Sequence, residues 1–357
     1  MNIDFHYGVV FMVTRLAGLD RAAAQTVAHA CQYVDDATTD GLLYFSGGET
    51  FERFASAHEM VDYTNADNDR NRTVWAPFHF LPGGLGTTFQ ARAICRRDSP
   101  IARQAVQRAI GAGREDNGLH RLGVTLHVYI DTWAHQGFAG IVSADNVVAE
   151  LTSDDIEPDG WLDSLKGKIE HWFDVGSTVV LSKLLPLGHG AALHYPDLPW
   201  ARWHYINGHG ERVDRDNPAD FLAAADMAAR AVRGFITGNE DYVALPGLHA
   251  DQQAALLQLI HENRDVNPLH RLAFLSQALS ADRMPGLAED IPAYIAKGPG
   301  SWKATATGID ARDDGDARPD WSQAFESSNY RKFHDAVKEH RYDVTQKILP
   351  AHQLRLA

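Results

Sequence analysis

One stretch, Leu119 to Phe138 (LHRLGVTLHVYIDTWAHQGF), constrains this chain more than any other. It reads as a helix on which His120, His127, Asp131 and His135 share one face, because successive residues are rotated by about 100°. The apolar residues between them predict that the helix is buried. A buried carboxylate without a partner is costly and tends to find a cation. The sequence therefore predicts that a cation lies opposite this face.

The composition limits how such a cation can be held. The chain has 357 residues, 45% of them hydrophobic and 22% charged, as in an ordinary globular protein. Its two cysteines provide neither a disulfide framework nor a cysteine-rich zinc module. Eighteen histidines are the compositional outlier. Nitrogen and oxygen ligands are therefore expected.

Charge and hydropathy exclude some classes of partner. The net charge of −14 makes stable binding to nucleic acid unlikely on electrostatic grounds. No apolar run approaches the roughly 20 residues of a membrane-spanning helix. The start, MNIDFHYG, does not have the form of a secretory signal. The expected location is the cytoplasm, with export by a specialised secretion system as the alternative.

Apolar residues at helical spacing predict a mainly α fold with minimal strand content. The pattern divides into a metal-binding helical core, residues 1–212, and a C-terminal helical region, residues 213–357, packed on it or continuous with it. The expected helices span 4–17, 20–37, 99–114, 119–138, 161–185, 218–236, 251–262, 269–281 and 321–349.

Further metal-ligand residues are spread along the chain. His127 and Asp131 form an i, i+4 pair, the common local arrangement of metal ligands on a helix. Two adjacent carboxylates, Asp35 and Asp36, end a predicted helix, where they oppose its dipole unless a cation is near. The remaining candidates are His6, His79, His189 and Asp197. Taken one at a time, each could instead be a packing or turn residue.

In their order along the chain, these candidates resemble the ligands of the superfamily of zinc-dependent phospholipase C and single-strand-specific nucleases, in particular a bacterial branch of it. The matching motifs are FHYG, QYVDDAT, PFHF, HVYIDTWAH and GHGAALHYPD, and the resemblance covers about residues 1–205. It implies a multi-helix core with a cluster of two or three zinc ions, for which manganese or iron could substitute. The additional C-terminal helices have no counterpart in it.

Departures from the family pattern leave several assignments open. Family members use the amine and carbonyl of an N-terminal tryptophan as ligands, whereas this chain begins Met1-Asn2, and we expect Asp4 to take that role. The last carboxylate falls further from its histidine than in the family, so His194 is the alternative to Asp197. In the same way Asp36 is the alternative to Asp35 as a ligand.

The resemblance implies a metal-dependent phosphoesterase. Asp131 would bridge two metals, Asp36 would act as general base toward the attacking water, and a small-molecule or lipid phosphodiester would be the substrate. A metal-binding protein without phosphoesterase activity, with a structural cluster or a partner-binding role, is the main alternative. A His-Asp phosphohydrolase is less favoured, because the one such dipeptide, His334–Asp335, is far in sequence from the other candidates.

Overall fold

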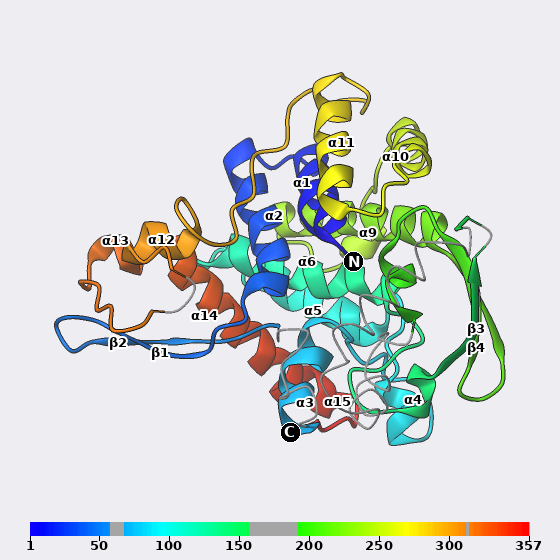
Figure 1. Ribbon diagram of the computed structural model, residues 1–357, viewed down its shortest axis with the longest axis horizontal. Coiled ribbons are helices and arrows are strands. Elements are labelled where there is room, and N and C mark those ends of the chain that lie inside the picture. Colours follow the sequence, from blue (N-terminus) through cyan, green and yellow to red (C-terminus); the bar gives the residue numbers. More distant parts are fainter. Residues whose placement is uncertain (58–67, 154, 157–191, 312–313, 357) are drawn as a thin grey trace, which may run out of the picture.

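The computed structural model describes residues 1–57, 68–153, 155–156, 192–311 and 314–356. The expected helix over 161–185 lies outside these residues. Most other expected helices are present with small shifts at their ends. For example, α2 (Arg21–Asp36) begins after Asp20, whose side chain accepts a hydrogen bond from the Ala23 backbone N–H. The expected helix over 321–349 is instead divided, because Ser328 caps the start of a new helix, α14 (Asn329–Tyr342), after the short α13 (Gln323–Glu326). Figure 1 shows these helices gathered into one body.

The expectation of a mainly α fold with almost no strand was wrong. The described residues are 53% helix and 10% strand, so the fold is mixed α/β. Its described residues form an antiparallel pair, β1 (Gly41–Tyr44) with β2 (Thr50–Arg53), and an antiparallel sheet in the order β3-β4-β5. The sheet strands are β3 (Val148–Ser153), β4 (Arg202–Asn207) and β5 (Arg212–Asp216). Strands of four to six residues carry too few alternations to stand out from loops in sequence.

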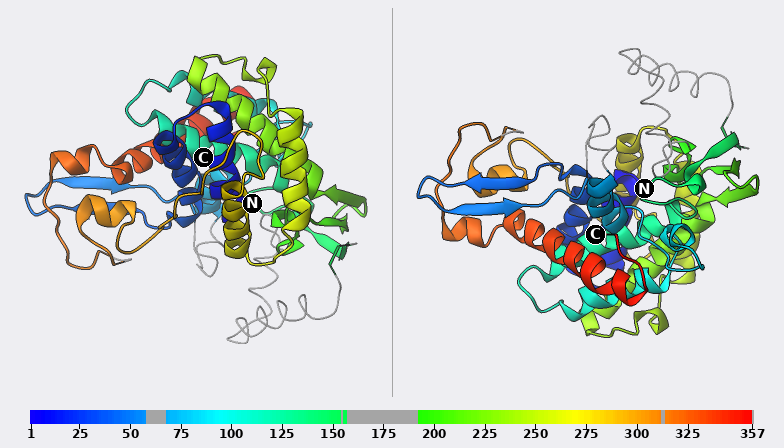
Figure 2. Two further views of the ribbon diagram at one scale, coloured as in Figure 1. Left: turned by 90° about the horizontal axis from the view of Figure 1, so that it is seen from above. Right: turned by 90° about the horizontal axis from the view of Figure 1, so that it is seen from below.

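The two sheets lie at opposite ends of the molecule. The β1–β2 pair projects away from the helical body with α12 (Trp302–Thr307) and α13 (Gln323–Glu326) beside it, as all views agree (Figures 1 and 2). The β3-β4-β5 sheet lies at the other end, and α9 (Asn217–Thr237) follows it directly.

Helix α6 (Gly118–Ala134) is the centre of the fold. It packs against α2, α5 (Pro100–Gly111), α9 and α14 (Asn329–Tyr342). Gly123 permits a close approach of α2, since a Cβ there would lie 2.5 Å from the Val27 carbonyl oxygen of α2. Because glycine has no side chain, the C-terminal end of α2 can lie beside the polar face of α6.

The N-terminal segment lies against the same face. Its first turns form a π-helix, η1 (Asp4–Val9), which continues into α1 (Val10–Ala17). Helix α11 (Pro268–Ser280) contacts η1, and α1 contacts α9. Elements from both ends of the sequence therefore surround α6. The remaining helical elements are α3 (Asn68–Phe78), α4 (Phe89–Ala93), η3 (Ala144–Asn146), η5 (Tyr195–Asp197), η6 (Tyr242–Ala244), α10 (Ala250–Glu262), η7 (Asp343–Ile348) and α15 (Leu349–Ala351).

Candidate metal centre

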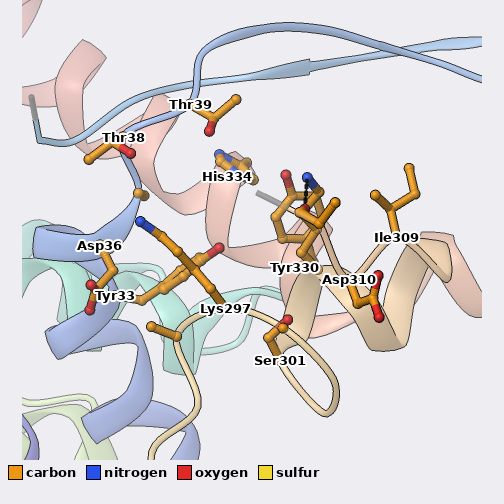
Figure 3. Close-up of a pocket in the computed structure, with 15 residues that line it drawn as sticks. Tyr33, Asp36, Thr38, Thr39, Lys297, Ser301, Ile309, Asp310, Tyr330 and His334 are labelled. Carbon is orange, nitrogen blue, oxygen red and sulfur yellow. Dashed lines mark hydrogen bonds between the residues drawn. The ribbon is translucent and has the colours of Figure 1, made fainter. Parts of the chain in front are cut away.

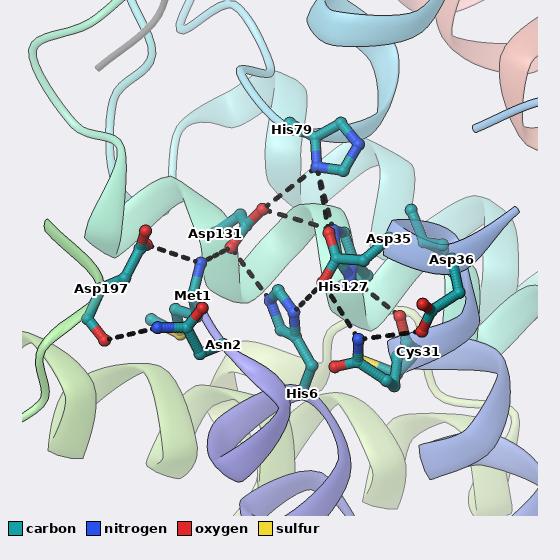
Figure 4. A network of polar contacts seen from close by, with 12 residues as sticks. Met1, Asn2, His6, Cys31, Asp35, Asp36, His79, His127, Asp131 and Asp197 are labelled. Carbon is teal, nitrogen blue, oxygen red and sulfur yellow. Dashed lines mark hydrogen bonds and ion pairs between the residues drawn. The ribbon is translucent and has the colours of Figure 1, made fainter. Parts of the chain in front are cut away.

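Potential ligands from five segments of the chain converge beside the buried face of α6 (Figure 4). They come from the N-terminus with η1, the end of α2, the residue after α3, helix α6 with its C-cap, and η5. The groups brought together are the Met1 amine, His6, Asp35, His79, His127, Asp131, His135 and Asp197.

Asp131 lies at the centre of this cluster and is almost fully buried, with its side chain 1% exposed. Its Oδ1 atom accepts a hydrogen bond from the Met1 ammonium at 2.7 Å and lies 3.0 Å from His6 Nε2. Its Oδ2 atom lies 3.4 Å from His127 Nε2 and 3.5 Å from His135 Nδ1. No hydrogen bond reaches Oδ2 from the described residues. A buried carboxylate oxygen in this state favours a cation as its partner.

Backbone carbonyls fix which ring nitrogens carry protons. His127 Nδ1 lies 2.8 Å from the Cys31 carbonyl oxygen, and His79 Nε2 lies 2.9 Å from that of Ser56. His135 Nδ1 lies 2.7 Å from the His79 carbonyl oxygen. A carbonyl only accepts, so these nitrogens are the donors and the opposite nitrogen of each neutral ring is a lone pair. Histidines that bind metals are oriented in this way.

The tautomers make one contact unfavourable without a cation. His127 Nε2 and His79 Nδ1 face each other at 3.2 Å, and both are lone pairs in the neutral rings. Asp35 Oδ1 adds a further acceptor, 3.6 Å from His127 Nε2 and 3.7 Å from His79 Nδ1. Three acceptors around one point repel one another unless a proton or a metal ion lies among them.

Two overlapping triads have the spacing of metal sites. His6, His127 and Asp131 form one, and Asp35, His79 and His127 form the other, each with ligand atoms within 4.8 Å of one another. Both triads use His127, whose Nδ1 donates to the Cys31 carbonyl, so only its Nε2 lone pair is left for a metal. One ion could take that lone pair, and a second ion would need ligands from elsewhere in the cluster.

The charge states of the triads suit metal binding. Burial opposes ionisation of Asp35, yet His127 and His6 lower its pKa to about 2. Burial likewise opposes ionisation of Asp131, but His135 and the Met1 ammonium hold its pKa well below the ordinary value. Burial and His6 lower the pKa of His127 to about 4. At neutral pH the cluster therefore has anionic carboxylates beside a neutral imidazole.

A third group of ligand atoms surrounds the N-terminal amine. Met1 N lies 3.1 Å from Asp197 Oδ1, which is 3.6 Å from His135 Nε2. Burial lowers the affinity of the amine for its proton, but Asp131 and Asp197 outweigh this and raise its pKa to about 11. The ammonium thus acts as a cation in this part of the cluster, and a metal would have to displace its proton.

The structure does not bring Asp4 to the cluster. Both of its oxygens accept hydrogen bonds from the Arg271 guanidinium, so the carboxylate is committed to a buried ion pair. The Met1 amine occupies the position expected for Asp4. An N-terminal amine does not depend on the side chain of the first residue, so the absence of a tryptophan was no reason to look for a substitute.

Of the two adjacent carboxylates at the end of α2, only Asp35 lies in the cluster. Asp36 is directed to Tyr294, whose hydroxyl donates to its Oδ2 at 2.6 Å. At the last ligand position, Asp197 is buried in the cluster and His194 is exposed. His189 lies outside the described residues.

His120 shares the polar face of α6 but is separate from the cluster. Its Nε2 lies 3.0 Å from Asn329 Oδ1 of α14. It serves as a contact between α6 and the C-terminal helices.

Sequence reasoning also missed two buried arginines from the C-terminal part of the chain. Arg271 holds Asp4, two residues before His6. Arg215 donates hydrogen bonds to the carbonyl oxygens of Trp133 and Ala134 at 2.8 and 3.0 Å, which end α6 next to His135. No local pattern distinguishes these arginines from surface ones, since both act across long sequence separations.

The model of one protein family matches this chain over almost its whole length. The model of a family of unknown function, DUF6765, matches residues 1–348. The chain belongs to this family. The DUF6765 match includes every residue of the cluster and continues through α11 and α14. Searches of curated proteins and of solved structures returned no match. Across the described residues, no helix is both long and apolar enough to cross a membrane.

Proposed function

We propose that this protein is a metal-dependent hydrolase that cleaves a phosphodiester with water activated by a cluster of two or three metal ions. The observation that carries the proposal is the contact of His127 Nε2 with His79 Nδ1 at 3.2 Å, beside the carboxylate of Asp35. A metal ion among these three acceptors would remove their mutual repulsion, and we propose a metal rather than a shared proton there. The resemblance to the phospholipase C and nuclease superfamily supplies the reaction class.

Different carboxylates would have different roles in the reaction. When bound, adjacent divalent ions supply a water of lowered pKa and positive charge for the phosphoryl oxygens. Asp131 would bridge the two sides of the cluster, since its two oxygens face different histidines. Asp36 lies beside the cluster rather than in it, with its Oδ2 accepting from the Tyr294 hydroxyl, and from that position it would take the proton of the attacking water. Burial raises the pKa of Asp36, which strengthens it as a base.

The proposal also covers the identity of the metal, the class of substrate and the cellular location. Histidine and carboxylate ligands suit zinc, and manganese or iron could take its place. A small-molecule or lipid phosphodiester fits the net charge of −14 better than a nucleic acid does. We also propose a cytoplasmic location, in keeping with the free thiols of Cys31 and Cys95.

Metal analysis and turnover together test the proposal. Protein purified without a histidine tag should contain two or three equivalents of divalent metal, and should hydrolyse bis(4-nitrophenyl) phosphate in a reaction that a chelator stops. Asp131→Asn should remove metal and turnover. Asp290→Asn is the matched control, because that carboxylate is 69% exposed and lies outside the cluster. Less than one equivalent of metal, or turnover that a chelator leaves unchanged, would contradict the proposal.

A metal-binding protein without phosphoesterase activity is the second candidate. The burial of the cluster favours it, since His127 is 0% exposed and structural metal sites are closed. In that case Asp131→Asn should lower the melting temperature strongly as metal is lost, and no phosphodiester should be turned over by the wild type. A catalytic centre should instead lose turnover with most of its thermal stability retained.

A further inference from the structure

Helix α14, from the C-terminal part of the chain, lies against the segments that carry the candidate metal ligands. It packs on α6 and on α3, and α3 ends one residue before His79. Two histidines of α14, His334 and His340, are buried in this contact. Because buried polar groups are normally hydrogen-bonded, the partners of these two rings show which parts of the chain the helix fixes in place.

His340 connects the segments that carry His79 and His127. Its Nε2 atom lies 3.1 Å from the Pro77 carbonyl oxygen, and Pro77 is two residues before His79. Its Nδ1 atom lies 3.3 Å from Thr125 Oγ1, and Thr125 is two residues before His127. His79 Nδ1 and His127 Nε2 are the two nitrogens that face each other at 3.2 Å. One side chain outside the cluster therefore bonds to both of the segments that present this pair.

The protonation state of His340 suits both contacts. The Pro77 carbonyl can only accept, so Nε2 carries the proton and Nδ1 accepts from the Thr125 hydroxyl. Burial lowers the pKa of His340 to about 4, so at neutral pH the ring is uncharged, with one donor and one acceptor. The two segments use the whole hydrogen-bonding capacity of the ring.

The C-terminal end of α3 depends on donors from other elements. The last carbonyl groups of a helix find no partner within that helix. His340 supplies a donor to the Pro77 carbonyl, and His135 Nδ1 supplies one to the His79 carbonyl at 2.7 Å. The ring of Phe78, between these two residues, packs on His340 with 5.4 Å between ring centres. His135 is itself a member of the cluster, so His340 is the support that comes from outside it.

His334 fixes the segment that contacts the ring of His79. Its Nδ1 atom lies 3.2 Å from the Phe54 backbone nitrogen and 3.2 Å from the Phe54 carbonyl oxygen. Two residues later, the Ser56 carbonyl accepts from His79 Nε2 at 2.9 Å. Figure 3 shows His334 on α14 beside the chain that leaves α2 at Thr38. Helix α14 thus reaches the chain on two sides of His79.

We propose that His340 is a positioning residue of the metal centre and sets the separation of His79 from His127. The inference rests on the proposed function, because it takes a metal to bind between these two histidines. A metal site requires its ligand distances to within about 0.2 Å, whereas a protein core can absorb larger shifts. Loss of His340 should therefore weaken metal binding beyond its effect on folding. The proposal gives the C-terminal region a role in the site.

Replacement of His340 tests the proposal through the zinc affinity of the full chain, measured by competition with a chelator. His340→Leu removes both hydrogen bonds and should raise the Kd for Zn²⁺ by about 10- to 100-fold, the usual effect of losing a group that orients a metal ligand. His340→Gln keeps an amide donor for the Pro77 carbonyl and should recover most of the affinity. His120→Leu is the matched control, because His120 is also buried and bonds to Asn329 of α14 away from the cluster. It should lower the melting temperature and leave the Kd unchanged.

A milder variant keeps the test independent of whether His340→Leu folds. Thr125→Val removes one hydroxyl group, keeps the shape of the side chain and should raise the zinc Kd severalfold. In the His340→Leu background it should raise the Kd no further, since both changes break the same contact. An unchanged Kd in Thr125→Val would overturn the proposal. A loss of affinity in His120→Leu equal to that in His340→Leu would also overturn it, because the effect would then follow from stability alone.

The positioning role and the proposed function fail separately, since zinc affinity is measured without turnover. Zinc binding that depends on His340, without hydrolysis of bis(4-nitrophenyl) phosphate, would retain the positioning role and remove the phosphoesterase. Chelator-sensitive hydrolysis with the same zinc Kd in wild type and His340→Leu would overturn the positioning role and retain the phosphoesterase.

Discussion

Arg271 holds Asp4 across 267 residues of sequence, with its Nε and Nη2 atoms 2.7 Å from the two carboxylate oxygens. Its side chain has no solvent exposure, and its guanidinium lies 5.4 Å from the centre of the Trp200 ring. Asp4 starts the turn that carries His6, and Trp200 follows Asp197 in the chain. The Arg271 guanidinium on α11 therefore contacts two ligand-bearing segments, one through its ion pair and one through the Trp200 ring.

Removal of the arginine should destabilise the fold. Arg271→Met leaves the Asp4 carboxylate buried and unpaired, and we expect the free energy of unfolding in urea to fall by about 3–5 kcal/mol. Arg212→Met provides the control, since Arg212 is 57% exposed in its pair with Asp214 and should cost less than about 1 kcal/mol. Similar losses in the two variants would show that the buried pair has no special role.

The histidines of α6 and its surroundings should differ in their effect on metal content. His79→Asn removes a ligand atom 3.2 Å from His127 Nε2 and should reduce bound metal by at least one equivalent. His120→Asn should keep the wild-type content, because its ring bonds to Asn329 away from the cluster. Elemental analysis after gel filtration measures both variants. Unchanged metal in His79→Asn would remove this histidine from the centre.

An extension of the N-terminus should disrupt the cluster. Gly-Ser-Gly placed before Met1 converts a buried ammonium, 2.7 Å from Asp131, into an uncharged amide and forces additional chain into a site with no exposure. We expect lower metal content and a lower melting temperature. The same three residues added after Ala357 should have no such effect. Equal metal and stability in the two extended proteins would mean that the amine is not needed.

Buried His334 should make stability depend on pH. Burial lowers its pKa from 6.5 to about 3 despite a hydrogen bond with the Phe54 backbone. Between these pH values the unfolded chain binds a proton that the folded chain excludes, so stability is full above pH 6.5 and falls as pH decreases toward 3. The slope is about 1.4 kcal/mol per pH unit for one proton.

The matched variants isolate this contribution. Urea unfolding of His334→Gln between pH 6.5 and 4.5 should show a shallower slope than the wild type, by about one proton. His270→Gln should keep the wild-type slope, because His270 is 68% exposed. An unchanged slope in His334→Gln would show that the ring is protonated in the folded state.

The sequence alone determined the helices and their polar face. Helical spacing around His127 and Asp131 placed them on the buried face of α6, and the Asp20 cap located the start of α2. Both rest on interactions within a few residues, which a single sequence displays directly. The short strands escaped detection, because β4 and β5 are stabilised by pairing with each other rather than by a local pattern.

Only the tertiary structure decided which candidates meet. Asp35 rather than Asp36 enters the cluster because α2 approaches α6 at Gly123 and presents one of two adjacent carboxylates to it. The Met1 amine replaces Asp4 because Arg271, far along the chain, takes the Asp4 carboxylate. A sequence shows which groups can bind a metal or a proton. The long-range packing of buried charges, each of which must be paired, determines where those groups lie.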